Sequence, residues 1–287
     1  MPRISAKTSE RLAKILLWGA GFLTILILAP IVIYVLVNGV SEINWEFLTT
    51  PPLGGLSGEG GISTVIVTTI YLILITIFIL TPVGIGAAIY LSEYAQDNIL
   101  TNFIRYAVET LAGVPSIIYG LFGYALFVSA LYLGHSLIAG ALTLVCLLLP
   151  TMIRTTEEAL RAVPQEYREA SLALGATRWQ TIWHVALPAA LPGIATAIIL
   201  STGRVIEETA CLYVTLGGSA AMPKSILSGG RTLALHVYYL AMDTMAFDKA
   251  MATAAVLIII IVIINLFTNW LSQRFRSAYT AMEEGRP

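Results

Sequence analysis

The sequence predicts an all-α integral membrane protein with six transmembrane helices. Of its 287 residues, 57% are hydrophobic and only 11% are charged, whereas soluble globular domains carry roughly 25% charged residues. The mean hydropathy of +0.82 also argues against a disordered chain. The formal net charge is −1, so the composition lacks the basic excess that is typical of a protein with a nucleic-acid partner.

Charged residues occur in clusters, and the apolar stretches between them are long enough to cross a bilayer, which takes about 20 residues per helix. Gly134 and His135 divide the longest apolar stretch, between Glu109 and Arg154, into two spans. Helices are expected because a backbone in hydrocarbon must satisfy its own hydrogen bonds. The six predicted spans lie near residues 16–37, 62–88, 111–132, 136–153, 190–213 and 250–271.

The distribution of Lys and Arg predicts that both termini are cytoplasmic. Twelve of the 16 Lys and Arg residues precede the first span, follow the sixth, or lie in the connections between spans two and three and spans four and five. The opposite connections hold only Lys224, Arg231 and Lys249, and cytoplasmic loops are the ones enriched in Lys and Arg. The first apolar stretch is longer than the core of a signal peptide, so we interpret it as a retained anchor.

Several kinds of chemistry find no support in the sequence. Cys146 and Cys211 lack CxxC spacing and are interpreted as small packing residues. His135, His184 and His236 fall in three different connections, so they offer no facing pair for a haem. The GxxxxGK[ST] phosphate-binding loop is missing. We therefore expect no cofactor in this chain, and ATP with its Mg²⁺ would be used by a partner chain.

The connection from Arg154 to Pro188 is far longer than two antiparallel helices require. Four of its residues are spaced for exposed pairing at i,i+4, namely Glu157, Glu158, Arg161 and Gln165. Pro164 interrupts this helix, and a second short helix is predicted from Gln165 to Leu174. Gly175 suits the end of that helix, where a positive φ is needed.

A third short helix is predicted after Gly175. Trp179, Ile182, Trp183 and Ala186 recur at helical spacing and form one apolar face. Two helices around a glycine, each with an apolar and a charged face, form a rigid projection. Such a projection could rest against the membrane or dock to a soluble partner, and amphipathicity alone is equally compatible with a solvated connector.

The residues of this connection carry a family resemblance. The connection contains a spaced pattern: Glu-Ala-Ser, then three residues, Gly, nine residues and Val-x-Leu-Pro. The residues that form it are Glu169, Ala170, Ser171, Gly175, Val185, Leu187 and Pro188. This pattern resembles the EAA loop of ABC-type import permeases, with Ser171 in place of the second Ala and Val185 in place of Ile. The resemblance implies that Glu169, Ala170, Ser171 and Gly175 dock on an ATP-hydrolysing subunit and carry its motion into the membrane helices.

Arg204, Glu207 and Glu208 are charged residues inside the predicted fifth span. Each charge near a helix centre opposes insertion by roughly 2.5 to 3.5 kcal/mol, so these side chains are not expected to face lipid. Their spacing allows them to share one helix face. They could form an interhelical clamp, mark a shallower span that ends near Arg204, or line an anion path in which Arg204 binds a phosphate-like oxyanion.

A narrower resemblance includes these charges. Arg204, Glu208, Thr209 and Ala210 are similar to the Arg-x-x-Gly-Glu-Thr-Ala stretch of the phosphate-specific permease subunits, with Glu207 in place of Gly. The stretches 81–94, 114–120 and 235–239 also resemble that family, and the last of them favours one of its two paired subunits. Taken singly, each stretch is better explained by helix packing, as with Pro82 as a kink. Their order along residues 60 to 275 carries the resemblance.

The resemblance implies the fold of type-1, MetI-like ABC import permeases. Residues 1–60 would be a cytoplasmic tail, the first span and an outer loop, 61–273 the permease core with its coupling loop 154–188, and 274–287 a cytoplasmic tail. The protein would lie in a prokaryotic inner membrane and import inorganic phosphate along a path containing Arg204, Glu207 and Glu208. Its partners would be a second permease subunit, a dimer of ATP-binding subunits and an extracytoplasmic phosphate-binding protein.

Three alternatives stay open at this point. The cargo could be phosphonate, sulfate or molybdate, because all of these oxyanions suit an Arg. An intramembrane enzyme acting on a lipid phosphate could use Arg204 with Glu207 or Glu208, although no His or nucleophilic Ser motif accompanies them. A carrier driven by an ion gradient would leave the long connection without a role.

Overall fold

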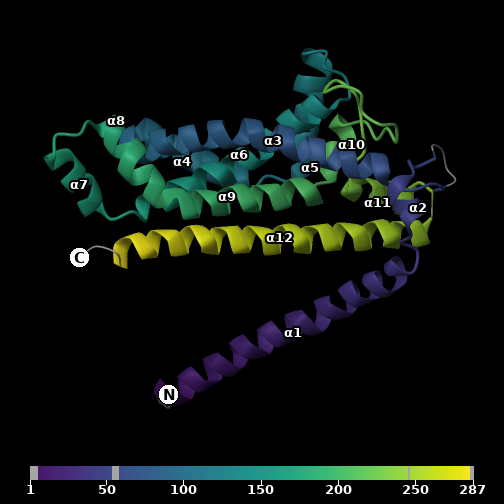
Figure 1. Cartoon of the computed structure of the whole chain (residues 1–287), viewed down its shortest axis with the longest axis horizontal. Helices are drawn as coiled ribbons and strands as arrows, with labels where there is room; N and C mark the ends of the chain where they lie inside the picture. The colour runs from purple at the N-terminus through teal and green to yellow at the C-terminus, as the bar shows by residue number, and fades with distance from the viewer. Residues whose placement is uncertain (1–5, 54–57, 245, 285–287) are drawn as a thin grey trace.

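The computed structural model describes residues 6–53, 58–244 and 246–284, and nearly all of them are helical (Figure 1). The elements are α1 (Ala6–Val40), α2 (Trp45–Thr49), α3 (Ser63–Ile89), η1 (Tyr90–Tyr94), α4 (Ile99–Ala112), α5 (Ser116–Gly123), η2 (Tyr124–Ala130), α6 (Leu137–Arg161), α7 (Gln165–Ala173), α8 (Arg178–Thr181), η3 (Ile182–Ala186), α9 (Leu187–Glu207), α10 (Ala210–Thr215), α11 (Leu233–Met242) and α12 (Phe247–Glu284). The three η elements are π-helical turns. The all-α prediction is confirmed.

Five helices of the described residues are long and apolar enough to cross a membrane: Glu10–Val40, Ser63–Tyr94, Leu137–Arg161, Arg178–Glu207 and Phe247–Phe267. Helix α4 and the helix formed by α5 and η2 meet at an angle of 104°. Counted together as one broken span, they make a sixth crossing. Pro115 lies at this break, where its ring and missing N–H prevent α4 from continuing. The predicted third span over 111–132 is therefore interrupted between Ala112 and Ser116, and the predicted count of six is reached when this bent pair is counted as one span.

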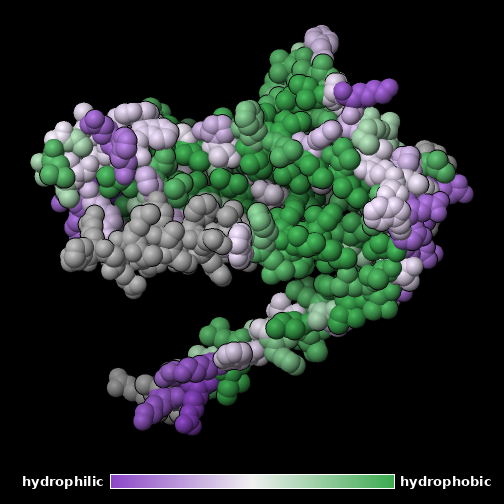
Figure 2. Space-filling model, in the orientation of Figure 1, coloured by the Kyte–Doolittle hydropathy of each residue, from purple (hydrophilic) through white to green (hydrophobic). Residues whose placement is uncertain are grey.

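The long helices run side by side, and their ends gather at two poles. One pole holds α7, α8 and the end of α12, and the other holds α2, α10 and α11 (Figure 1). Hydropathy follows the same axis, because an apolar belt separates hydrophilic surfaces at the two ends (Figure 2). The end of α12 therefore lies at the α7 pole, and α1 starts toward the same side of the molecule but apart from the bundle (Figure 1). That this pole faces the cytoplasm is our prediction from the Lys and Arg distribution.

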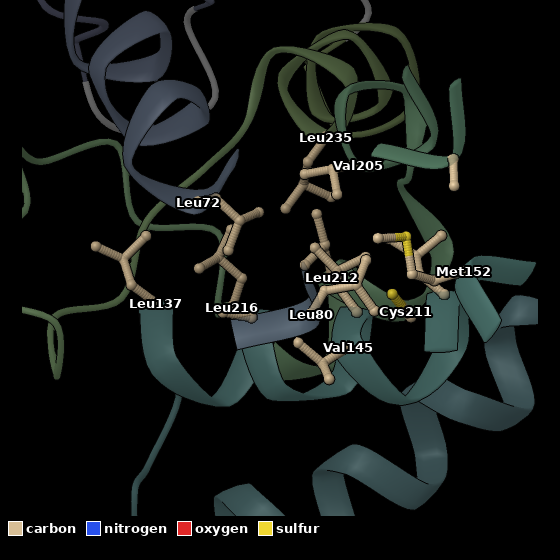
Figure 3. Packing of buried hydrophobic residues seen from close by; sticks show 14 residues of the cluster. Leu72, Leu80, Leu137, Val145, Met152, Val205, Cys211, Leu212, Leu216 and Leu235 are labelled. Carbon is tan, nitrogen blue, oxygen red and sulfur yellow. The ribbon is translucent and has the colours of Figure 1, made fainter. Parts of the chain in front are cut away.

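The main core lies where α3, α6 and α9 meet α10 and α11. Leu72 and Leu80 of α3 belong to one buried cluster with Val145 and Met152 of α6 and Leu212 of α10 (Figure 3). In lipid such contacts stabilise through close packing, because the solvent is as apolar as the side chains.

Small residues allow the helices to approach one another. A Cβ placed on Gly84 would clash with Cγ of Met152, which is fully buried. A Cβ on Gly86 would meet nothing within 4 Å. Of these two glycines, Gly84 is therefore the one required for the α3–α6 contact.

Helix α1 stands apart from this core. The carboxyl end of α1 contacts the start of α12, where Gly39 lies against Met251 and Ala255. From this contact toward its amino end, α1 diverges from α12 (Figure 1). Its apolar window is exposed throughout, which suits a helix surrounded by lipid or by another subunit.

Candidate functional site

The predicted projection between the fourth and fifth spans has α7 as its tip. Helix α6 continues to Arg161, Pro164 is extended, and α7 begins at Gln165. The helix ends at Ala173, one residue earlier than predicted, and Gly175 has a φ of +86°, as its position after a helix requires. Thr177 then caps α8 in a reciprocal capping box with Gln180.

The projection exposes apolar side chains just after α7. None of the residues of α7 is buried, and Leu174 at its carboxyl end is 90% exposed. Trp179 and Trp183 are also exposed and pack edge to face, with ring centroids 5.3 Å apart. Exposed aromatic and aliphatic side chains on a short, capped element are typical of a surface that another chain covers.

The structure separates the predicted coupling residues into two groups. Glu169 and Ala170 are exposed on α7, and Gly175 has open space around its Cα. Ser171 is half-buried, and its hydroxyl lies 2.9 Å from that of Thr181 in α8. Ser171 therefore holds α7 against the helix that follows, whereas Glu169 and Ala170 face outward.

The third short helix was wrongly predicted as a separate element. Trp179 to Ala186 form the start of one continuous helix, Arg178–Glu207, which also contains the fifth span. Ile182 and Ala186 of its apolar stripe are buried, while the two tryptophans of the stripe are exposed. Pro188 does not end the helix, because the π-helical turn η3 lies directly before it and rearranges the hydrogen bonds there.

An ion pair that the sequence did not indicate joins α7 to the end of α3. Arg168 donates from Nη2 to Oε1 of Glu93 at 2.8 Å and from Nε to Oε2 at 3.3 Å. Its Nη1 and Nη2 also donate to the carbonyls of Val163 and Leu160, each at 2.8 Å. Both charged side chains are 12% exposed. The two partners are 75 residues apart, so only the fold brings them together.

The same pole has a polar pocket of about 520 Å³ beside α7. The side chains of Arg161, Arg168, Arg178 and Glu93 contribute to its lining, together with residues of the α6–α7 link and of α8. The pocket lies between α7 and the ends of α3 and α6, so the side chain of Arg168 reaches Glu93 along its edge.

The second candidate site is the charged group in the fifth span. Arg204 donates from Nη1 to Glu207 at 3.0 Å, and its Nη2 lies 3.4 Å from Oε2 of Glu208. Arg204 and Glu207 are about half exposed, whereas Glu208 is buried. The structure brings the three side chains together, but Glu208 lies beyond the last residue of α9 and so not on a helix face shared with Arg204 and Glu207.

These charges are not in the middle of a helix. Helix α9 ends at Glu207, Glu208 is extended, and α10 begins at Ala210, so the predicted helix over 190–213 is broken. The carboxylate of Glu208 accepts a hydrogen bond from the backbone N–H of Cys211 at 3.4 Å, which stabilises the start of α10. The interpretation of a span that ends near Arg204 therefore fits the backbone.

A half-buried cation lies near the opposite pole. Arg231 donates from Nε to the carbonyl of Gly218 at 2.9 Å, and its guanidinium carbon lies 4.1 Å above the ring of Tyr239. Its Nη1 lies 3.2 Å from Nδ1 of His236. Burial and the neighbouring guanidinium lower the pKa of His236 to about 3, and burial lowers the pKa of Arg231. His236 is therefore neutral and accepts from Arg231.

Among the described residues, no group of three or more His, Cys, Asp and Glu side chains could hold a metal ion. The candidate sites are instead the exposed helix α7 and the half-exposed charged break between α9 and α10. Such arrangements can bind a partner chain or a ligand and can move with it.

The multi-pass helical fold and its projecting helix define the membrane-spanning component of a transporter. The chain belongs to the family of binding-protein-dependent transport system inner membrane components, whose model matches residues 80–279. It is thus a permease subunit of an ABC importer with the type-1 fold, and ATP is hydrolysed by a partner chain. The predicted family and fold class are confirmed.

Individual relatives agree with this assignment. The chain is 35% identical to the probable ABC transporter permease protein YqgI of Bacillus subtilis, over 97% of this chain and all of that protein. It is 38% identical to the phosphate transport system permease protein PstA 1 of Mycobacterium tuberculosis, over 64% of this chain and 62% of that one. These relatives confirm the resemblance to the PstA type.

A solved structure shows the same fold. The bacterial alginate ABC transporter, in complex with a periplasmic protein carrying an alginate pentasaccharide, contains a chain that superimposes with a TM-score of 0.68. The match covers 93% of this chain and 96% of that chain at 17% sequence identity. At this identity the likeness concerns the fold alone.

Proposed function

We propose that this chain is the permease subunit of an ATP-driven inorganic phosphate importer. It forms half of the translocation pathway and couples to an ATP-binding subunit through the segment 154–188. The observation that carries the coupling role is α7 itself, an exposed helix with the residues Glu169, Ala170 and Ser171 of the EAA pattern, held in place by Gly175 and by the cap at Thr177.

The docked partner of α7 is an ATP-binding subunit. A helix of nine residues with Leu174 and Tyr167 exposed can enter a groove, and its amino-terminal end carries Glu166 and Glu169 for polar contacts at the rim of that groove. In the assembled importer a dimer of ATP-binding subunits engages this permease and a second one, and binds ATP with Mg²⁺. An extracytoplasmic phosphate-binding protein delivers the cargo at the opposite pole.

The choice of phosphate rests on the relatives named PstA and on the charged break. Arg204 is half exposed and presents a planar set of donors of the kind that binds oxyanions. Glu207 and Glu208 restrain its guanidinium, and we assign Glu208 to positioning or gating. Phosphonate, sulfate and molybdate are oxyanions that could accept from the guanidinium of Arg204 in the same way. A transport assay in which these anions compete with phosphate therefore identifies the cargo.

Co-purification of the chain from native membranes tests this function. We expect companions of three kinds, namely a second permease, an ATP-binding subunit and a phosphate-binding protein, and ATP hydrolysis by the complex that inorganic phosphate stimulates. Stimulation by sulfate or molybdate with no response to phosphate would change the cargo. Transport that continues without the ATP-binding subunit would overturn the coupling role.

A further inference from the structure

Helix α7 contacts the membrane helices in two ways that differ in chemistry. Its backbone packs on α8 and η3, and Ser171 shares a hydrogen bond with Thr181 there. Its connection to the end of α3 is made by a side chain, since Arg168 reaches across to Glu93 in η1. A displacement of α7 therefore reaches the fifth span through packing and reaches the second span through an ion pair.

We propose that Glu93 and Arg168 are a positioning pair that makes η1, the end of α3, move with α7 when the partner subunit closes. This inference rests on the proposed coupling role of α7. In this proposal the motion of α7 reaches α3 as well as the helix that follows the EAA pattern and contains the fifth span.

The geometry of the pair suits the transmission of force. Two donors of one planar guanidinium meet two oxygens of one carboxylate, and such a fork fixes both distance and orientation. Both side chains are largely shielded from solvent, so salt screens the attraction less than it does at a surface pair. A lysine could supply the charge of Arg168 without the fork.

Arg168 is itself fixed to a third helix. Its bonds to the carbonyls of Leu160 and Val163 satisfy groups at the carboxyl end of α6 and in the link to α7. The side chain of Arg168, which belongs to α7, thus contacts both α6 and η1. A movement of α7 therefore acts on both of these elements through Arg168.

The turn η1 is also tied to α4. Arg105 of α4 donates to the carbonyl of Leu91 at 2.9 Å and to the carboxylate of Glu157 in α6 at 3.2 Å. The side chain of Arg105 also pairs with Asp97. Movement of η1 would therefore be passed to α4, the first half of the broken span, and would reach a large part of the bundle.

The test measures coupling and geometry separately in the complete complex in lipid vesicles. For Glu93→Gln and for Arg168→Lys we expect the amount of phosphate imported per ATP hydrolysed to fall at least tenfold. Glu10→Gln, which breaks the exposed pair of Glu10 and Lys14 in α1, serves as the matched control and should leave the ratio unchanged within twofold.

A distance measurement keeps the inference testable if phosphate proves not to be the cargo. Genetically encoded spin labels at Leu174 and Ile99, which are both 90% exposed, report the separation of α7 from the start of α4. We expect one narrow distance distribution without nucleotide and with bound ATP, and a broadened one in Glu93→Gln. A wild-type import ratio in Glu93→Gln, or an equally narrow distribution in that variant, would overturn the proposal. A narrow wild-type distribution without phosphate-stimulated hydrolysis would instead contradict only the cargo.

Discussion

The hydroxyl oxygens of Ser171 and Thr181 lie 2.9 Å apart, across the turn that joins α7 to α8. Thr181 is buried, so this contact is one of the few fixed points between the projecting helix and the helix that crosses the membrane. Ser171 occupies the position where the EAA pattern has its second Ala. The polar residue in this chain thus adds a bond at a position where the pattern has a methyl group.

Ser171→Ala is expected to destabilise the complex by about 1 kcal/mol, because it leaves the buried hydroxyl of Thr181 without its partner. The double variant Ser171→Ala with Thr181→Val should recover most of this loss, since two apolar groups of similar shape replace the pair. Thermal unfolding of the purified complex measures both effects. Additive losses in the double variant would show that the two hydroxyls do not interact.

Gly175→Asp is expected to abolish ATP-driven uptake while the protein still inserts into the membrane. Gly175 lies at the exposed tip of the projection with a φ of +86°, and a carboxylate there would enter the partner interface without a counterion. Gly175→Asn is the matched control, because Asn has the same size and tolerates positive φ similarly. Uptake in vesicles should be retained better in the Asn variant, and equal loss in both would place the effect in the backbone.

Arg204→Gln is expected to reduce phosphate uptake more than tenfold with normal assembly, because it removes the donors offered to the anion. Glu207→Gly, which restores the residue found in the phosphate-specific pattern, should leave uptake at or above the wild-type rate. Initial uptake rates with assembly checked by co-purification decide between the roles. Unchanged uptake in Arg204→Gln would reduce Arg204 to a clamp for the buried carboxylate of Glu208.

The stability of the chain is expected to fall as the pH drops below about 6.5, with a contribution from His236. The folded protein holds the pKa of His236 at about 3, whereas an unfolded histidine has a pKa of about 6.5. Between these values the unfolded state binds a proton that the folded state excludes, so stability rises with pH there by up to about 1.4 kcal/mol per pH unit. Above this window the contribution is constant.

Thermal unfolding in detergent between pH 7 and pH 5 measures this dependence. His236→Gln should flatten it, because the amide oxygen of Gln can still accept from Arg231 but does not titrate. The variant His184→Gln, at an exposed histidine, controls for the exchange of a histidine for glutamine elsewhere in the chain. An identical slope in His236→Gln and the wild type would contradict the assignment.

The elements that the sequence predicted well are those defined by local pattern. Long apolar runs identified the spans, and Pro164 with Gly175 bounded α7 closely. The end of the helix that contains Trp179 and the end of the fifth span were predicted wrongly. In both cases the reason is that residue spacing does not reveal whether a helix continues. The stripe from Trp179 continues through Pro188 because η3 accommodates the proline, and the fifth span stops at Glu207 although the sequence remains apolar beyond it.

The contacts that tie the site together could not be predicted from one sequence. Arg168 precedes the EAA pattern and Glu93 lies in a stretch of family resemblance, but neither residue type indicates its partner across 75 positions. The pair of Arg204 and Glu207 was predictable because helical spacing alone places the two side chains together, whereas Glu208 pairs with Arg204 from beyond the end of α9. Local charge patterns thus give local pairs, and tertiary pairs require the fold.

Photo-crosslinking from position 174 in native membranes tests the central claim, that α7 is gripped by an ATP-hydrolysing partner. A photoreactive side chain at Leu174 is expected to capture the ATP-binding subunit. The same group at Tyr132, which is 91% exposed beyond the opposite end of α6, should not. Capture of that subunit from position 132, or its absence at position 174 in an assembled complex, would contradict the account.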